Sequence, residues 1–437
     1  MVKYGCLLFS ILPILLMNGC ATLQETADKD DLKIQAGQIY RGDKAFTVQA
    51  VHVPGLFEKG AGLEFMVPAM ARIAEAGGNA IALDLSGFSE DGRSLNPDSV
   101  NTVSVYAERA KDQRMVLVVR VLGDAADAGF RDNAVETAAR ALKGEGLALY
   151  WIDGPDAAAL AARFKDLAPS LVVASPQNGD IQTVADPNLA GNNGLVLLTG
   201  VLPLDPWGET HFVLPGSDET YARLEEAYTN ETERRPWTPD NSLLSEEERN
   251  AGYVSLFNGR DLDNWWHFYH GKESFRVSKE GYIECYQAGA GGLVTRDRYD
   301  SFILRLEYKL NDAGANSGIH LWVPRAARQS KIGFEFQLMG DSDLTEPHAT
   351  STGAVYDVVP ALTVATRPEG EWNELEIMLQ GSHLRATLNG TVVQDLNFDE
   401  VEELRYRLRR GFIGLQDHDD YVVFRNIRIK KREPANP

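Results

Sequence analysis

The pattern of hydrophobic positions divides the chain into two parts with different periodicities. Across residues 47–228, short β-rich runs alternate with segments whose apolar residues recur at helical spacing. One such helix is expected in "GLEFMVPAMARIAEAGG", which stops at a glycine pair, and the apolar strand "NAIALDLSGF" follows it. This alternation of strands and helices predicts right-handed crossovers and a parallel sheet covered by helices.

The number of strand–helix units limits the architecture of this first part. Further helices are expected over residues 97–112 and in "NAVETAARALKG" and "DAAALAARFKDL", with strands such as "MVLVVRVLG", "LALYWIDG", "LVVASP" and "GLVLLTGV" between and after them. Five or six such units fit here, whereas a complete eight-unit barrel typically takes ~250 residues. We therefore expect residues 46–230 to form a shortened or degraded β/α barrel, loosely similar to glycoside hydrolase barrels, or an open parallel sheet.

The second part, residues 253–432, has short alternating runs rich in aromatic residues and punctuated by Gly, Asn and Asp. Its "LNGT" segment fits a type I′ hairpin turn, because Asn-Gly tolerates the positive φ values of that turn. We expect an all-β, jelly-roll-like sandwich of two antiparallel sheets. Residues 231–252 contain two prolines and a charge run without apolar periodicity, which indicates a linker.

One strand of the second part carries polar residues in an alternating pattern. In "GFEFQLMGD", Phe334, Phe336 and Leu338 would line one face, while Glu335 and Gln337 line the other. Such alternation is typical of a half-buried strand with a solvated outer face. The pattern alone leaves open whether the polar face is only wet or holds a site.

Composition and charge narrow the classes of partner. A chain of 437 residues is too long for one compact core, and its 44% hydrophobic and 24% charged residues are ordinary for a globular protein. The net charge of −20 argues against a nucleic-acid partner, because phosphate binding requires an excess of clustered Lys and Arg.

The first residues are typical of an export signal. Lys3 precedes an apolar run that is too short to span a bilayer, and the run ends in "LMNGC". This ending resembles the lipobox of bacterial lipoproteins, which implies a signal peptide over residues 1–19, lipidation of Cys20 and a tether over residues 20–45. Plain secretion with cleavage near Ala21 is the alternative. In the lipobox interpretation the protein is anchored in the cell envelope, and Cys285 remains as a packed thiol in a strand without a disulfide partner.

Polar residues also stand where strands of the first part end. They are Asp84, Arg120, Asp124 and Asp153. In parallel α/β architectures ligands bind at the carboxyl ends of the strands, although an Asp there is often only a helix cap or turn residue. The segment "YWIDGPDA" places Trp151 beside Asp153, a combination that suits a sugar.

Several phrases of the second part resemble one family closely. They are "LSEEERNAGYVSLFNGRDLDNW", "GANSGIHLWVPR", "GFEFQLMGD", "STGAVYDVVPA", "PEGEWNELEIMLQG", "LNGTVVQDL" and "GFIGLQDHDDYVVFRNIRIK". They occur in the same order in the 3-keto-disaccharide hydrolase family, and the resemblance covers residues 244–431. It implies a concanavalin A-like lectin/glucanase fold and a carbohydrate substrate whose glucosyl C3 is already a ketone, supplied by a separate sugar 3-dehydrogenase.

The ketone changes which bond-breaking chemistry is accessible. Because the carbonyl acidifies the C2 proton, a base can remove that proton, the enolate can expel the C1 aglycone, and water can add to the unsaturated sugar. A retaining glycosidase would instead need two carboxyl groups about 5–5.5 Å apart. On the face of Glu335 the next acid is Asp341, which a straight strand would place about 20 Å away, at ~3.3 Å per residue.

The matched phrases supply the candidate site residues. Glu335 is the expected base, with His320 and His418 as candidates for acid–base work, since the unperturbed pKa of histidine lies near neutrality. The candidates for substrate binding are Gln337, Asn316, Ser317, Tyr356, Trp372, Gln416 and Asp341. Cofactors are left open, with a divalent cation near Asp341 and His348 as one option. A non-catalytic carbohydrate-binding protein and a conventional sandwich-type glycoside hydrolase are the alternatives.

Overall fold

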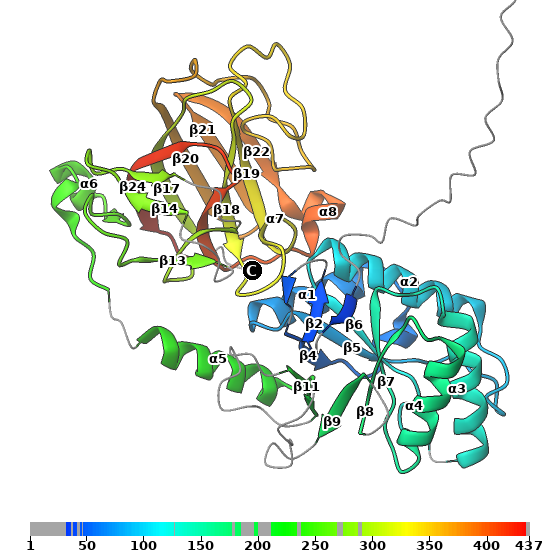
Figure 1. The fold of residues 1–437 in the computed structure, drawn as a ribbon. Helices are drawn as coiled ribbons and strands as arrows, with labels where there is room; N and C mark the ends of the chain where they lie inside the picture. The colour runs from blue at the N-terminus through cyan, green and yellow to red at the C-terminus, as the bar shows by residue number, and fades with distance from the viewer. Residues whose placement is uncertain are drawn as a thin grey trace, which may run out of the picture.

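The computed structural model describes residues 32–35, 38–41, 44–45, 47–125, 127–176, 180–184, 196–199, 211–233, 237–268, 274–286 and 291–433. They form two parts that lie side by side (Figure 1), an amino-terminal α/β part and a carboxyl-terminal β part. The predicted signal, Cys20 and most of the predicted tether lie outside these residues. No helix within the described ranges is both long and apolar enough to cross a membrane.

Eight parallel strands of the first part close into a barrel, in the order β10-β11-β4-β5-β6-β7-β8-β9. The strands are β4 (Gln49–His52), β5 (Ala80–Asp84), β6 (Val116–Arg120), β7 (Ala148–Trp151), β8 (Val172–Ser175), β9 (Ile181–Val184), β10 (Val196–Thr199) and β11 (His211–Pro215). Strands β9 and β11 were missing from the sequence prediction, and they complete the ring. The open parallel sheet is therefore the wrong alternative.

In the described ranges, helices cover only part of this barrel. They are α1 (Leu63–Glu75), α2 (Pro97–Asp112), α3 (Ala128–Leu142), α4 (Ala157–Leu167) and α5 (Asp218–Glu233), with the 3-10 turn η1 (Phe57–Lys59) before α1. Helix α2 begins as the sequence predicts, because the Asn96 side chain accepts a hydrogen bond from Asp98 N and Pro97 occupies the first turn. Between β8 and β9 the described chain has no room for a helix, so the barrel is degraded on that side.

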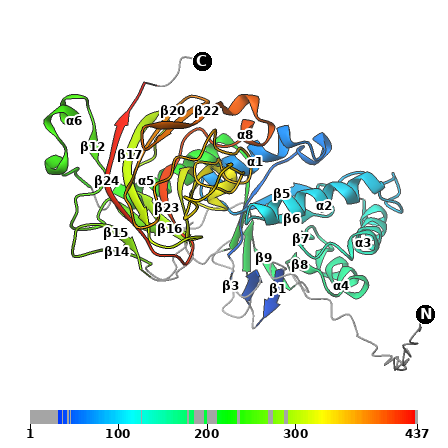
Figure 2. The same ribbon diagram turned by 90° about the horizontal axis from the view of Figure 1, so that it is seen from above.

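Alternate residues of each barrel strand face two different cores. Val51, Leu83 and Leu117 pack under the helices, whereas Ala50 and Val118 fill the interior of the barrel. A small antiparallel sheet, β1 (Leu32–Gln35), β2 (Gln38–Arg41) and β3 (Lys44–Ala45), lies beside β8 (Figure 2). Its fully buried Ile39 joins the interior cluster, and β3 lies just before the amino-terminal end of β4, so this sheet plugs the amino-terminal end of the barrel.

The second part consists of two antiparallel sheets. The larger sheet has the order β14-β15-β24-β17-β20-β21-β22, with β12 paired to β24, and the smaller has the order β13-β16-β23-β18-β19. The larger contains β12 (Val254–Ser255), β14 (Phe275–Val277), β15 (Ile283–Cys285), β17 (Phe302–Leu310), β20 (Asn373–Gln380), β21 (His383–Leu388), β22 (Thr391–Asn397) and β24 (Val422–Lys431). The smaller contains β13 (Trp265–Phe268), β16 (Gly291–Thr295), β18 (Asn316–Val323), β19 (Phe334–Met339) and β23 (Phe412–Asp417).

The core of the second part lies between these sheets. Phe336 and Leu415 of the smaller sheet and Leu304 and Ile377 of the larger belong to one buried cluster, as expected for a sandwich. Cys285 is a free, buried thiol, which confirms its predicted packing role. Short helices α6 (Glu246–Asn250), α7 (Gln329–Ile332) and α8 (Glu402–Arg405) and the 3-10 turns η3 (Asn241–Leu243) and η4 (Phe398–Glu400) complete the part.

The segment that leads into α7 connects the two parts. Arg325 Nη2 lies 3.3 Å from Glu225 of α5, and Arg328 Nη1 lies 3.1 Å from Asp112 at the end of α2. Ala327 and Ile332 are buried in the same cluster as the outer core of the barrel. In Figure 1, α7 and α8 accordingly lie on the side of the sandwich that faces the barrel.

Candidate functional site

The polar residues of "GFEFQLMGD" lie on the face of the smaller sheet that points away from the sandwich core. Strand register places Glu335 opposite His320 and Gln337 opposite Gly318. Because Phe336 and Ile319 face the core, Glu335, Gln337 and His320 face the other side. That face is shielded from solvent, since Glu335 is only 2% exposed and His320 is only 4% exposed. The polar face therefore forms a buried cluster rather than a solvated surface.

Glu335 and His320 form the centre of this cluster. Oε2 of Glu335 lies 3.2 Å from Nε2 of His320, so one proton can be shared between the two side chains. Gly318 makes room for the carboxylate, because a Cβ at that position would lie 2.5 Å from Oε1 of Glu335. Gly414 of β23 makes similar room beside His320, where an added Cβ would lie 3.2 Å from the His320 Cβ.

Three glutamine side chains lie on the same face of the smaller sheet as this pair. Gln337 donates through Nε2 to Asn316 Oδ1 at 2.7 Å, so these two predicted binding residues lie side by side. Gln416 of β23 lies on the same face, because it pairs with Gly292 of β16 while Leu415 and Leu293 face the core. Gln329 of α7 lies over Gly292, since a Cβ added there would lie 3.6 Å from its Oε1.

The cluster contains five buried polar atoms without a hydrogen-bond partner in the described structure. They are His320 Nδ1, Gln329 Nε2, Glu335 Oε1, Gln337 Oε1 and Gln416 Oε1. An unpaired buried polar atom costs free energy, and such atoms are rare in folded proteins unless a ligand or water completes them. One amide donor and several acceptors on one face match the hydroxyl and carbonyl groups of a sugar.

Gln329 was not predicted as a site residue, because α7 is a short helix in a connection without a recognisable pattern. The backbone of α7 is fixed by Arg407, whose Nη1 donates to Ser330 O at 2.8 Å and to Gly333 O at 3.3 Å. Burial lowers the pKa of Arg407 to about 10. Its neighbouring residue also anchors the segment, since Leu408 N donates to Ile332 O.

Two predicted residues lie beside the cluster without a side-chain contact to Glu335. Ser317 is fully buried, but its Oγ donates to Gln416 O, so it ties β18 to β23 rather than pointing at the cluster. Tyr356 is half-buried next to β19, and its backbone N–H donates to Glu335 O.

Of three other predicted residues, Asp341 and Trp372 make their described contacts outside the cluster, and His418 is exposed. His418 is exposed in the turn after β23. Asp341 accepts hydrogen bonds from N and Oγ1 of Thr352, and burial raises its pKa despite these bonds. Trp372 packs on Tyr282, with ring centroids 5.1 Å apart, and on the Arg425 guanidinium, on the larger sheet. No group of three His, Cys, Asp or Glu side chains that could hold a metal ion occurs among the described residues.

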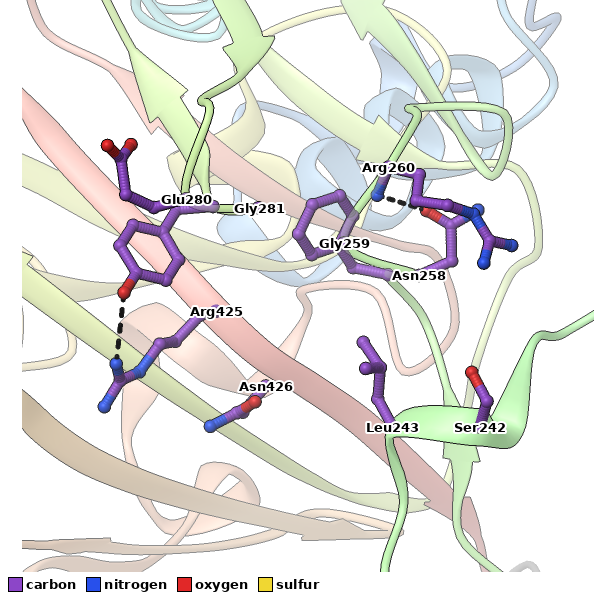
Figure 3. Close-up of a pocket in the computed structure, with 11 residues that line it drawn as sticks. Ser242, Leu243, Asn258, Gly259, Arg260, Glu280, Gly281, Arg425 and Asn426 are labelled. Atoms are coloured by element: carbon purple, nitrogen blue, oxygen red, sulfur yellow. Dashed lines mark hydrogen bonds between the residues drawn. The ribbon is translucent and has the colours of Figure 1, made fainter.

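The larger sheet carries a separate pocket (Figure 3). Its volume is about 480 Å³, and it is lined by Tyr282, Arg425, Asn258 and Arg260, among others. Arg425 donates to the Tyr282 hydroxyl at 3.5 Å, and Arg260 N donates to Asn258 Oδ1 at 2.9 Å. Its lining residues include no histidine and so no counterpart of the Glu335–His320 pair.

With this geometry established, comparison with known proteins identifies the second part. Residues 252–430 match the model of the 3-keto-alpha-glucoside-1,2-lyase-like domain family. The carboxyl-terminal region therefore carries a 3-keto-disaccharide hydrolase domain, and this assignment supports a glycosidase-type enzyme. The match lies outside the barrel.

One named relative and two solved structures are similar to this chain. A 3-keto-disaccharide hydrolase of Bacteroides thetaiotaomicron is 27% identical, over 41% of this chain and 78% of the relative. Two crystal structures of proposed glycosyl hydrolases from Parabacteroides distasonis are also similar. One is 26% identical with a TM-score of 0.38, covering 44% of this chain and 99% of the other, and the second is 23% identical with a TM-score of 0.36, covering 41% and 99%.

Proposed function

We propose that the 3-keto-disaccharide hydrolase domain cleaves 3-keto-glycosides by elimination followed by addition of water, at the Glu335 cluster. The observation that carries this proposal is the buried Glu335–His320 pair with unpartnered atoms on both residues. An elimination needs one base, a donor for the developing enolate and a route for the proton to the leaving oxygen.

The residues of the cluster can be assigned to these steps. Glu335 Oε1 takes the C2 proton, the C2–H electron pair forms the enolate, and Gln329 Nε2 donates to O3 as negative charge develops there. The enolate then reforms the C3 carbonyl and expels the C1 aglycone, whose oxygen receives the proton through the Glu335–His320 pair. Water adds at C1 of the resulting enone, and a proton returns to C2. Gln337 and Gln416 accept hydrogen bonds from sugar hydroxyls through their free Oε1 atoms.

A conventional retaining mechanism fits the cluster less well. It requires a second carboxyl group about 5–5.5 Å from the first. Among the described residues that form the cluster, Glu335 is the single carboxylate, because Asp417 faces the Cys285 thiol and Asp341 is bonded to Thr352. The lone carboxylate therefore favours elimination.

The test is cleavage of a 3-keto-glucoside with a chromogenic aglycone in deuterated water. We expect aglycone release with deuterium at C2 of the sugar, because the proposed base exchanges its proton with solvent. Glu335→Gln should lower kcat on the order of 10³-fold, as for loss of a general base. Glu374→Gln, on the exposed side of β20, is the matched control and should keep full activity.

The competing carbohydrate-binding function makes a different prediction. In that case the wild-type protein would bind the sugar but release no aglycone, and Glu335→Gln would bind equally well. Aglycone release without deuterium at C2 would instead support conventional hydrolysis.

The remaining sequence expectations extend this proposal. A concanavalin A-like jelly-roll topology, export, a lipid on Cys20 and a position in the cell envelope suit an enzyme for extracellular sugars. A separate sugar 3-dehydrogenase is the class of enzyme that would supply the ketone. Metabolic labelling with a palmitate analogue tests the lipid, since a Cys20→Ser variant should lose the label.

A further inference from the structure

The carboxyl end of the barrel gathers polar side chains that the proposed function does not use. Along β4, β5, β6 and β7, the interior positions Ala50, Ala82, Val118 and Leu149 are each followed, two residues later, by His52, Asp84, Arg120 and Trp151. Because side chains two apart in a strand share a face, these four side chains also point inward, at the mouth of the barrel.

The strand register places these residues at nearly the same height along the barrel axis. Asp84 pairs with Arg120, and Arg120 pairs with Trp151. Asp153 follows two residues after Trp151, at the start of the loop to α4. This arrangement is the one in which barrel proteins place their ligand sites, at the carboxyl ends of the strands.

Arg120 connects the carboxylates of the mouth. Its Nε donates to Asp153 Oδ2 at 2.9 Å, its Nη1 lies 3.4 Å from Asp84 Oδ1, and its Nη2 lies 2.9 Å from Asp124 Oδ1. The guanidinium is therefore fully engaged by groups of the protein. With His52 neutral, the three carboxylates and the one guanidinium give the mouth a net charge of two negative units.

His52 and Trp151 complete the ring of side chains. His52 Nε2 lies 3.1 Å from Asp84 Oδ2, and the His52 and Trp151 rings meet edge to face with centroids 6.4 Å apart. Burial alone would raise the pKa of Asp84, but His52 and Arg120 outweigh it and hold that pKa below its ordinary value. Asp84 thus stays ionised and restrains both neighbours.

Three buried atoms of the mouth lack a hydrogen-bond partner in the described structure. One is His52 Nε2, which the Asp84 carboxylate approaches to 3.1 Å, and the other two are the Trp151 Nε1 donor and the Asp153 Oδ1 acceptor. A network that served only to close the barrel would gain stability by satisfying both atoms, because each unpaired polar atom costs free energy. A free donor and a free acceptor at the same mouth suit a hydroxyl group, since it both accepts and donates.

The charge of the mouth narrows the chemical class of ligand. An anionic group such as a carboxylate or phosphate would meet three carboxylates and a guanidinium already occupied. A metal ion lacks a ligand set, because no group of three candidate ligands is found in the described ranges. An organic amine would pair with Asp153 but would leave the Trp151 N–H unsatisfied.

We propose that the mouth of the barrel is a second carbohydrate site, which binds a neutral saccharide through Trp151 Nε1 and Asp153 Oδ1. The site is independent of the Glu335 cluster, since its residues come from β4–β7 of the barrel. The chain would then hold a sugar at the barrel while the sandwich domain acts on its own substrate.

The test is saturation-transfer NMR on the full chain with neutral glucose, galactose, mannose, xylose, cellobiose and trehalose, and with glucuronate and glucosamine as charged probes. We expect at least one neutral sugar to bind and the charged probes to bind more weakly. Trp151→Phe keeps an aromatic ring without the N–H, and it should weaken this binding on the order of tenfold. Asp153→Asn should weaken it as well.

Matched variants separate this site from the sandwich domain. Trp372→Phe and Glu335→Gln should leave the barrel binding unchanged, with circular dichroism and thermal melting as checks that every variant folds. The proposal is overturned if no neutral sugar binds, if binding depends on Glu335 instead of Trp151 and Asp153, or if a charged probe binds more tightly. If Trp151→Phe does not fold, sugar binding by Asp153→Asn is compared with that of the wild type. Unweakened binding by Asp153→Asn then overturns the proposal.

Discussion

Gly318 shows how a single residue determines where the Glu335 carboxylate lies. The backbone of β18 passes so close to Glu335 that a methyl group at position 318 would meet Oε1 at 2.5 Å and Cγ at 2.9 Å. Glycine therefore serves here for close approach and not for an unusual φ value. The absence of a side chain lets Glu335 keep its contact with His320.

We predict that Gly318→Ala displaces the carboxylate. Overpacking of this kind typically costs about 1–3 kcal/mol, and a misplacement of about 1 Å lowers turnover on the order of 10²-fold. Denaturant unfolding and aglycone release measure the two effects. Gly146→Ala is the control, because a Cβ there meets nothing within 4 Å, and an equal loss of activity in both variants would contradict the argument.

At the scale of elements, α7 links the site to the rest of the sandwich. This helix has four residues and carries Gln329 over the smaller sheet. Too short to be stable alone, it depends on tertiary contacts, above all the Arg407 guanidinium that donates to Ser330 O and Gly333 O. Arg407 thus acts as a positioning residue for Gln329 and for the start of β19.

We predict that Arg407→Lys loosens α7. A lysine ammonium cannot reproduce the fixed fork of arginine, so at least one buried carbonyl loses its donor, at a cost of about 1–3 kcal/mol. If Gln329 stabilises the enolate, kcat should fall while KM changes little. Urea unfolding and steady-state kinetics measure these effects, and Arg410→Lys, an exposed arginine three residues further on, should change neither.

At the scale of the whole molecule, Glu225 joins the barrel to the sandwich domain. Its carboxylate contacts Arg298 and Arg325, whose side chains are 10% and 3% exposed. Arg325 lies only four residues before Gln329. The contact with Glu225 of the barrel therefore restrains the segment that leads into α7. The barrel therefore contributes to the geometry of the sandwich domain besides holding its own ligand site.

We predict that Glu225→Gln weakens this coupling. Removing the charge that faces two poorly solvated arginines should cost roughly 2 kcal/mol, a figure reduced for the partial exposure of Glu225. Calorimetry should then show two separate unfolding transitions for the barrel and the sandwich, in place of a more cooperative one. Asp218→Asn, on the same helix but 94% exposed, should leave the melting curve unchanged, and the same splitting there would refute the proposal.

Local patterns in the chain were sufficient for many elements. Asn96 and Pro97 marked the start of α2, and the alternation at residues 334–338 separated the core face of β19 from its polar face. The capping box of Ser245 and Glu248 also marks α6 inside the segment interpreted as a linker. These features depend on residues a few positions apart, so the sequence carries them directly.

The sequence by itself determined the two-part architecture and, through the resemblance of its ordered motifs, the class of the second domain and the hypothesis that Glu335 is the base, because periodicity and ordered motifs are local properties. Only the tertiary structure decided that eight strands close the barrel, that Gln329 lies over the smaller sheet, that His418 is exposed and that Trp372 packs on the larger sheet. The physical reason is register and packing. Side chains from segments far apart in the chain meet only when strand pairing and domain contacts bring their faces together, and no single stretch of sequence encodes that meeting.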